Sequence, residues 1–319
     1  MKRVLVTGAG GTVGLQVIRF LLSEGKYDIT ALELKTKKAY SRIKKFRKRI
    51  NIVFGDVNDS GVIDALVKEN DIIIHLAGVL PQLANVRDDL CKEVDFNGTR
   101  VIVKAIKNYN PTCHLFYASS TSVYGKQNDP NNITVKSSNN IDSYDYYSKY
   151  KLKCEEYIKK NIKNYTIYRL AYILGDPGPE EIIYNVVPSC NMETVSVQNV
   201  GYAFACGIDH LKELNRKTFN VSGGESFRVN YRDYMIHLLK YYGLTLKFFS
   251  SWLLSEKNYY SGFYKDGNVL DDILKFRSKS LNYYYSTLYK YKRRVGRFIP
   301  RMLALPFISS YKKKLGKDK

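Results

Sequence analysis

Short runs of β-branched and aliphatic residues alternate with longer amphipathic stretches over the first half of the chain. The short runs predict strands over residues 2–7, 28–33, 51–55, 71–77, 114–119 and 165–171. The longer stretches, in which apolar residues recur every three or four positions, predict helices over residues 13–24, 60–69, 96–108 and 147–161. This alternation is typical of βαβ units, so we expect an α/β protein with a doubly wound parallel sheet.

The regular alternation ends near Arg169. The remaining pattern predicts a loop, two short strands and then a helical, tyrosine-rich region, over residues 175–181, 195–200, 218–224 and from about residue 225 onward. We therefore expect three parts, which are residues 1–175 with residues 195–221 returning to them, a smaller portion over 176–289, and a basic amphipathic tail over 290–319.

Positive charge is concentrated in two segments of this 319-residue chain, whose formal net charge is +21. Residues 35–49 hold nine lysines and arginines without an acid, and residues 290–319 hold eleven with Asp318 as the only acid. The rest of the chain is nearly neutral. The charge therefore disfavours a nucleic-acid-binding protein with a basic surface that runs across the fold.

Both basic segments also contain apolar residues. Ala39, Ile43, Phe46 and Ile50 recur at helical spacing, and the tail holds an apolar stretch of about fourteen residues between basic ends. This tail is too short and too interrupted to span a bilayer, so it suits either packing onto the second part of the chain or lying at a membrane surface. Since no run of eighteen apolar residues and no signal peptide occur, we expect a cytoplasmic protein, with peripheral attachment at the inner membrane face as an alternative.

Cysteines and histidines form no pattern that predicts a metal or disulfide site. The five cysteines are scattered without a C-x-x-C pair, and the four histidines show no ligand spacing. We therefore expect free thiols and no bound metal.

The first predicted strand runs directly into the sequence TGAGGTVG, residues 7–14. Gly8, Gly11 and Gly14 fit the pattern G-x-x-G-x-x-G, and a helix is predicted to follow. Residues without a Cβ let backbone N–H groups approach a pyrophosphate closely, and the N-terminus of a helix favours negative charge. The context of strand, loop and helix therefore predicts a dinucleotide site rather than a simple tight turn.

Two acidic residues follow at the ends of the next two predicted strands. Glu33 is placed to accept hydrogen bonds from both ribose hydroxyls of NAD and would repel the 2′-phosphate of NADP. Lys35, Lys37 and Lys38 could instead bind that phosphate, but the glycine loop contains no basic residue, so NAD is favoured. Asp56 is placed either to accept from the adenine amine or to cap the helix that follows.

Three further motifs follow along the chain, HLAG at residues 75–78, ASSTSVYG at 118–125 and YRLAYILG at 168–175. Together with the glycine loop, they resemble the motifs of the extended short-chain dehydrogenase/reductase family, the NAD-dependent epimerases and dehydratases. The resemblance spans roughly residues 2 to 230. It implies a Rossmann-type sheet with a smaller C-terminal substrate domain, NAD as the cofactor, and a homodimer formed by helices over 87–108 and 147–161.

The acid–base pair of this family is a Tyr-x-x-x-Lys motif on a helix. Tyr147 and Lys151 have this spacing, and the sequence KLKCEEY from Lys151 onward resembles the family's continuation of the helix. Tyr40 and Lys44 share the spacing but lie in the first basic segment. Residues four apart share a helix face, so the ammonium can lie near the phenol and lower its pKa. The phenolate can then take the proton of a substrate hydroxyl while a hydride passes to the cofactor.

The resemblance also implies the rest of the site. It makes Ser120 the third catalytic residue, whose hydroxyl hydrogen-bonds the substrate oxygen, although a strand-end serine can also simply cap a turn. It assigns cofactor binding to the glycine loop, the ends of the next three strands and the helical lysine, namely Gly8, Gly11, Thr12, Val13, Gly14, Glu33, Asp56, Val57, Leu76, Ala77, Gly78 and Lys151.

The chain departs from the family pattern at several positions. Asp95 stands where the family has an asparagine that steadies the active-site helix, and Tyr150 stands where it has a serine. Tyr172 replaces an asparagine that meets the nucleotide-sugar, and the segment from 178 to 195 is short for an enzyme of that class. The last two departures weaken the case for a nucleotide-sugar without affecting the predicted redox core.

Three functions remain open. The first is an NAD-dependent epimerase or dehydrogenase of a secondary alcohol, for which a nucleotide-sugar is the commonest family substrate. The second is an NAD(P)-dependent reductase or dehydrogenase of a lipid-like or sterol-like alcohol, which Tyr172 and the tyrosine-rich C-terminal half favour. The third is a cofactor-binding scaffold without turnover, which Ser120, Tyr147 and Lys151 together disfavour. A 4,6-dehydratase is set aside because Thr121 and Ser122 stand where that subclass has an aspartate and a glutamate.

Overall fold

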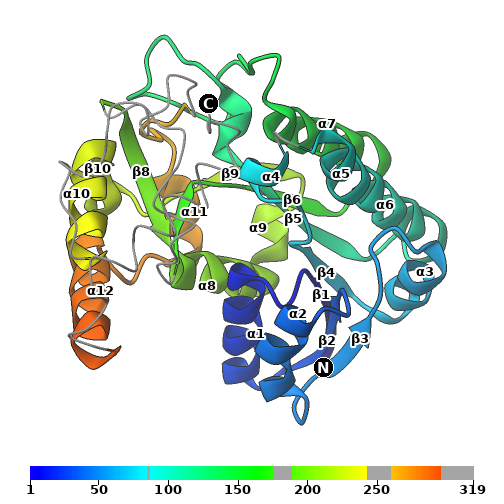
Figure 1. Cartoon of the computed structure of the whole chain (residues 1–319). Helices are drawn as coiled ribbons and strands as arrows, with labels where there is room; N and C mark the ends of the chain where they lie inside the picture. The colour runs from blue at the N-terminus through cyan, green and yellow to red at the C-terminus, as the bar shows by residue number, and fades with distance from the viewer. Residues whose placement is uncertain (85–86, 176–188, 243–259, 296–319) are drawn as a thin grey trace, which may run out of the picture.

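In the computed structural model, the chain is described over residues 1–84, 87–175, 189–242 and 260–295. A seven-stranded sheet forms the centre of its larger part (Figure 1). In spatial order the strands are β3 (Asn51–Phe54), β2 (Tyr27–Glu33), β1 (Lys2–Thr7), β4 (Ile72–His75), β5 (His114–Ser120), β6 (Tyr165–Leu170) and β9 (Lys217–Val221). All neighbouring strands are parallel, and the order reverses between β1 and β4, so the predicted Rossmann-type doubly wound sheet is confirmed.

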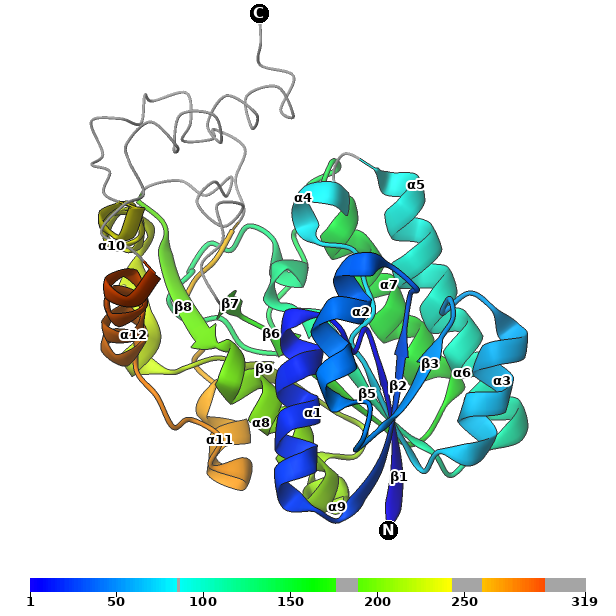
Figure 2. The ribbon, with the colours of Figure 1, turned by 60° about the horizontal axis from the view of Figure 1, so that its bottom comes forward.

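Helices cover both faces of this sheet (Figure 2). One face is covered by α1 (Thr12–Glu24) and α8 (Val197–Gly207), and the other by α3 (Ser60–Glu69), α6 (Gly98–Tyr109) and α7 (Tyr146–Asn161). Because both faces are covered, the central strands are apolar without alternation, and every residue of β4 is buried.

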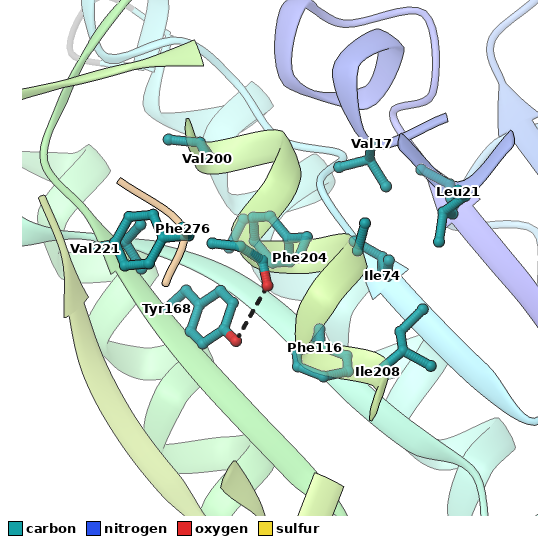
Figure 3. Close-up of a cluster of buried hydrophobic side chains, with 14 of the residues drawn as sticks. Val17, Leu21, Ile74, Phe116, Tyr168, Val200, Phe204, Ile208, Val221 and Phe276 are labelled. Atoms are coloured by element: carbon teal, nitrogen blue, oxygen red, sulfur yellow. Dashed lines mark hydrogen bonds between the residues drawn. The ribbon is translucent and has the colours of Figure 1, made fainter. Parts of the chain in front are cut away.

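Aromatic side chains fill the core between α8 and the sheet (Figure 3). The ring of Phe204 lies 4.9 Å from that of Tyr168 and 6.4 Å from that of Phe116, measured between ring centres. The Tyr168 hydroxyl donates a hydrogen bond of 3.5 Å to the backbone oxygen of Ala203. These contacts hold α8 across β5 and β6.

The strand predicted over residues 195–200 is wrong from residue 197 onward. Strand β8 (Asn191–Ser196) ends at Ser196, and α8 begins at the next residue. The Ser196 hydroxyl accepts a hydrogen bond of 3.1 Å from the N–H of Asn199. Serine in this position satisfies a free N–H of the first helical turn, which favours the change from strand to helix.

A smaller three-stranded sheet lies beside the large one, in the order β10 (Arg228–Asn230), β8 and β7 (Tyr172–Leu174). Helices α10 (Tyr231–Tyr242) and α12 (Leu281–Val295) pack with it around a second core that is rich in tyrosine. The ring centre of Tyr172 lies 5.9 Å from that of Tyr234 in this core. Helix α11 (Asn268–Leu274) instead contributes buried leucines to the core of the large sheet.

Short helical elements complete the described chain. They are α2 (Lys37–Ile43), η1 (Lys44–Phe46), α4 (Pro81–Ala84), α5 (Asp88–Cys91), η2 (Lys92–Asn97), η3 (Thr121–Tyr124), η5 (Ile208–His210), α9 (Leu211–Leu214) and η6 (Glu225–Phe227). None of the described helices is long and apolar enough to cross a bilayer.

The apolar face predicted for residues 39–50 packs against the protein. Ile43 and Ile50 are buried in the core of the large sheet, and Phe46 packs against it. Most of the predicted loop at 175–181 and of the tail at 290–319 lies outside the described residues.

Candidate active site

The predicted site residues meet at the carboxyl edge of the large sheet. The glycine loop follows β1, Glu33 ends β2, residues 76–78 follow β4, and Ser120 ends β5. In doubly wound sheets, ligands bind at this edge where the strand order reverses, which here is between β1 and β4.

The glycine loop has the geometry of a phosphate cradle. Gly8 has a φ of +63°, and a Cβ at this position would lie 2.7 Å from the backbone nitrogen of Ala77. A Cβ at Gly14 would lie 2.5 Å from the backbone oxygen of Gly8. Helix α1 begins after Gly11 with no side-chain cap and no acidic residue in its first turn, which includes Thr12 and Val13. The N–H groups of that turn can therefore bind an anion, so these residues fit the pyrophosphate of a dinucleotide.

Hydrogen bonds to the Thr7 hydroxyl hold the segment after β4 against the glycine loop. The Thr7 hydroxyl accepts from the backbone N–H groups of Leu76 and Ala77, each at 3.2 Å, and lies 2.7 Å from Nδ1 of His75. Burial, with the charge of Lys151, lowers the pKa of His75 to about 3, so the imidazole is neutral. Leu76 and Ala77 are thus held beside the glycine loop, and Gly78 follows them directly.

Glu33 is folded back over the glycine loop. Its Oε2 accepts from the N–H of Gly10 at 2.6 Å, and its Oε1 accepts from the N–H of Leu34 at 3.1 Å. The loop itself contains no basic residue, but α2 brings Arg42 to it, and Nη2 of Arg42 donates to the Thr12 hydroxyl at 3.3 Å. The polar face predicted for residues 39–50 indicates that Arg42 is exposed, but the sequence does not predict that Arg42 lies beside Thr12.

Asp56 does not cap the helix that follows it. Asp59 is the N-cap of α3, and its Oδ1 accepts from the N–H groups of Gly61 and Val62 at 2.9 and 3.2 Å. Asp56 instead accepts from the N–H of Asn58 at 2.9 Å, so of its two predicted roles the capping role is wrong. The Val57 side chain is buried in the core, so any cofactor contact at that residue would come from its backbone.

The three predicted catalytic residues lie together. Nζ of Lys151 lies 5.6 Å from the centre of the Tyr147 ring, and the Ser120 hydroxyl forms a hydrogen bond with the Tyr147 side chain. Ser120 also accepts from the N–H of Ser122 at 3.1 Å and caps η3. The capping role and the position beside Tyr147 are therefore compatible.

A buried hydrogen-bond network anchors the helix that carries Tyr147 and Lys151. Glu155, one turn beyond Lys151, accepts from the Ser119 hydroxyl at 2.6 Å. It also pairs with Arg169, at 2.9 Å from Nε to Oε1 and 2.7 Å from Nη2 to Oε2. Because Ser119 lies on β5 and Arg169 on β6, this network fixes α7 to two strands of the sheet.

Asp95 forms an ion pair with Lys151 that the sequence does not predict. Its Oδ1 lies 2.9 Å from Nζ, which also donates to the backbone oxygen of Ala118 at 3.1 Å. Burial disfavours the ammonium, but the charges of Asp95 and Tyr147 outweigh it and raise the pKa of Lys151. For Tyr147, burial is the largest cause and raises the pKa; Lys151 and Ser120 lower it, and Asp95 raises it. The unusual acid at position 95 was visible in the sequence, but its partner was not.

The described residues contain no group of three His, Cys, Asp or Glu side chains that could hold a metal ion. All five cysteines lie in this part of the chain and are free thiols.

The model of the NAD dependent epimerase/dehydratase family matches residues 4–198. The chain belongs to this family. The glycine loop, the ends of β4 and β5, and the Tyr147–Lys151 helix all lie within the matched residues, as does the Asp95 carboxylate.

Individual relatives match part of the chain. CDP-paratose 2-epimerase of Salmonella typhi is 29% identical over 129 residues, which are 39% of this chain and 38% of that protein. D-erythronate dehydrogenase of Cupriavidus necator is 25% identical over 185 residues, which are 55% of this chain and 56% of that protein. The chain thus matches less than two thirds of the length of either relative.

A solved structure shares the fold over a longer stretch of the chain. UDP-glucuronic acid 4-epimerase from Bacillus cereus, in complex with UDP-glucuronic acid and NAD, has a TM-score of 0.75 at 15% identity. The comparison covers 92% of this chain and 100% of that chain.

Proposed function

We propose that this protein is an NAD-dependent epimerase or dehydrogenase that acts on a secondary alcohol of a nucleotide-sugar. The observation that carries the proposal is the proximity of Ser120, Tyr147 and Lys151 at the edge of the sheet that also holds the glycine loop. Membership of the family supports it, as do the nucleotide-sugar epimerases among the similar proteins.

In this proposal, Tyr147 is the general base in the oxidation direction. Its phenolate takes the proton of the substrate hydroxyl, and the Ser120 hydroxyl hydrogen-bonds the same oxygen. When bound, NAD would supply the acceptor for the hydride and, for an epimerase, its donor in the return step. The ammonium of Lys151 stabilises the phenolate because an opposite charge nearby favours the ionised form.

Cofactor and substrate binding are assigned to different parts of the chain. We assign the cofactor to residues 1–175 with 195–221, and the substrate to the remaining residues of 176–289. The pairing of β9 with β6 supports the return of the chain to the first part. For the cofactor, the hydrogen bond from Gly10 to Glu33 supports NAD, because a carboxylate beside the loop would repel a 2′-phosphate.

The alternative substrate, a lipid-like or sterol-like alcohol, has less support. It was favoured by Tyr172 and by the aromatic C-terminal half. Tyr172 packs against Tyr234 in the second core, which accounts for an aromatic residue at this position without a lipid-like ligand.

The test is turnover of a panel of nucleotide-sugars and other secondary alcohols with NAD. We expect at least one nucleotide-sugar to be converted, either to a stereoisomer without net change in NADH fluorescence or to an oxidised product with a rise in it. The matched control is Tyr147→Phe. NAD binding without conversion of any compound would contradict the proposal and favour a cofactor-binding scaffold.

We further propose a homodimer formed through the region from α5 to α6 and through α7. Partly buried aromatic rings on this side of the molecule support it, since Phe96 lies 6.3 Å from Tyr150 and 6.2 Å from Tyr157 between ring centres. Such rings are common at protein interfaces. Sedimentation of the full chain at micromolar concentration would contradict the proposal if it gave the mass of one chain.

Peripheral attachment of a cytoplasmic protein to the inner face of a membrane is proposed for the basic segments. The exposed Lys35, Lys37 and Lys38 support attraction to anionic headgroups. The burial of Ile43 and Ile50 limits this attraction to charge at the first segment, because its apolar face packs inward.

A further inference from the structure

We propose that Asp95 is a positioning residue that holds Lys151 in a buried ion pair and thereby moves the acid–base range of Tyr147 to higher pH. The inference rests on the function proposed above, in which Tyr147 and Lys151 act on the substrate. It concerns a position where this chain has a carboxylate and the family pattern has an amide.

The two oxygens of the Asp95 side chain have different partners, because Oδ1 lies in an ion pair and Oδ2 accepts hydrogen bonds. Asp95 lies on the π-helical segment η2 and is 1% exposed. Its Oδ1 lies 2.9 Å from Nζ of Lys151, and its Oδ2 accepts from the N–H of Val79 at 2.9 Å and from Sγ of Cys91 at 3.6 Å. An asparagine would turn its NH₂ group toward one of these donors. The surroundings therefore fit a carboxylate better than an amide.

The backbone around Asp95 keeps the ion pair in one arrangement. The backbone oxygen of Asp95 accepts from the Thr99 hydroxyl at 2.6 Å and from Sγ of Cys154 at 3.3 Å. A Cβ at Gly78 would lie 2.8 Å from Oδ1 of Asp95 and 3.2 Å from Nζ of Lys151. The absence of a side chain at Gly78 therefore leaves the space in which the two charges meet.

The ion pair changes what Lys151 does for Tyr147. A buried ammonium alone would stabilise the phenolate strongly, because little solvent screens it. With the carboxylate 2.9 Å away, the pair is close to neutral, so the phenolate gains less. The causes that act on the pKa of Tyr147 agree with this argument. Burial raises the pKa, the charge of Lys151 lowers it, and the charge of Asp95 raises it.

Other titratable groups around the pair do not supply a competing charge near neutral pH. They come from α5, β4, β5 and α7 and are Cys91, His75, Tyr117, Tyr147 and Cys154. Burial lowers the pKa of His75, which keeps its imidazole neutral, and raises the pKa of the two thiols and of Tyr117, which keeps them protonated. Asp95 therefore supplies the negative charge beside Lys151 near neutral pH.

The test removes the charge of Asp95 and follows Tyr147 in two ways. In Asp95→Asn and in Asp95→Ala, which avoids the misplaced NH₂ group, we expect the acid limb of the pH profile of kcat/KM to move down by roughly one pH unit. Asp95→Glu keeps the charge and should restore the original limb. If either Asp95→Asn or Asp95→Ala folds and its acid limb lies at the original pH, the proposal is overturned. A merely structural role of Asp95 would lower activity without moving the acid limb.

The second measurement needs neither turnover nor a variant at position 95. The ¹³C signal of the Tyr147 phenol, identified by its loss in Tyr147→Phe, is titrated in the full chain without substrate or added cofactor. We expect its midpoint above the ordinary tyrosine value of about 10. A midpoint below that value would overturn the proposal even if the neutral variants fail to fold. Because this titration does not depend on activity, absence of turnover would count against the proposed function only.

Discussion

Lys151 lies one turn from Tyr147 on α7, with its ammonium nitrogen 5.6 Å from the centre of the ring. Lys149 and Lys153 lie at comparable distances from Tyr146 and Tyr150, 5.7 and 5.2 Å. Of the three lysines, however, Lys151 alone is buried. Solvent screens exposed charges, so the electrostatic effect of a lysine on a phenol is greatest at Tyr147.

Tyr147→Phe should lower kcat by roughly 10²–10⁴-fold, because it removes the group that exchanges a proton with the substrate. The affinity for NAD and the melting temperature should stay near those of the unmodified chain. Tyr146→Phe is the control and should retain activity. Steady-state kinetics of the two variants give the kcat values. Near-normal turnover by Tyr147→Phe would refute the role of Tyr147 in proton transfer.

Ser120→Ala should lower kcat by about 10²-fold, because it removes a donor aimed at the reacting oxygen. Ser122→Ala is the matched control, since the Ser122 hydroxyl donates to Ser120 at 2.9 Å from the adjacent turn. We expect a smaller loss in the control. Equal kcat values in the two variants would mean that Ser120 serves only as the cap of η3.

The unmodified chain should bind NAD more tightly than NADP, and Glu33→Ala should narrow or reverse this preference. The change removes the carboxylate that accepts from Gly10, while Arg42 stays beside Thr12. In the Glu33→Ala background, Arg42→Gln should reduce the gained NADP affinity. Calorimetric titration measures the dissociation constants of NAD and NADP for each variant. Tighter binding of NADP than of NAD by the unmodified chain would contradict the prediction.

Glu155→Gln should lower the free energy of unfolding by about 3–5 kcal/mol at neutral pH, because it breaks a buried pair and leaves Arg169 without its carboxylate. Glu156→Gln, an exposed neighbour, should change it by less than about 0.5 kcal/mol. Denaturant unfolding of both variants measures the difference. A similar small effect in both would show that the network does not anchor α7.

The same pair gives a pH dependence with a defined sign. Burial opposes ionisation of Glu155, but Arg169, with Lys159 and Ser119, outweighs it and lowers the pKa in the folded state below 4.5. A group with a lowered folded pKa stabilises the protein above its unfolded pKa and loses this contribution as the pH falls. The stability gap between the unmodified chain and Glu155→Gln should therefore shrink as the pH falls below about 4.5 toward the lowered value.

The full chain should co-sediment with anionic vesicles at low salt, and a chain that ends near Tyr289 should do so less. Each basic residue near an anionic surface contributes on the order of 1 kcal/mol, and salt screens the attraction. Neutral vesicles are the control. A full chain that ignores anionic vesicles would contradict peripheral attachment.

Much of the fold could be predicted from the hydrophobic pattern because each strand and its covering helix are local in sequence. Residues 2–7 and 60–69 form the predicted strand and helix with unchanged bounds. The pattern was less informative where one side chain decides the outcome. Ser196 caps a helix that begins within a run whose alternating pattern predicts a strand. Asp59, not Asp56, caps α3.

The contacts of the candidate site depended on tertiary structure. The spacing of Tyr147 and Lys151 is a property of one helix, so it was visible in the sequence. The pairing of Lys151 with Asp95 and the approach of Arg42 to Thr12 each join separate elements, so no periodicity encodes them.

The position of α8 and β9 bears on how the chain folds during its synthesis. When Leu170 has left the ribosome, six strands of the large sheet are available, but β9 has not yet formed beside β6 and α8 does not yet cover Phe116 and Tyr168. At roughly 5–20 residues per second, several seconds pass before Val221 follows. During that interval the nascent protein presents an open β edge and an aromatic surface, both of which promote aggregation. The nascent chain should therefore be most prone to aggregation in the interval before β9 emerges.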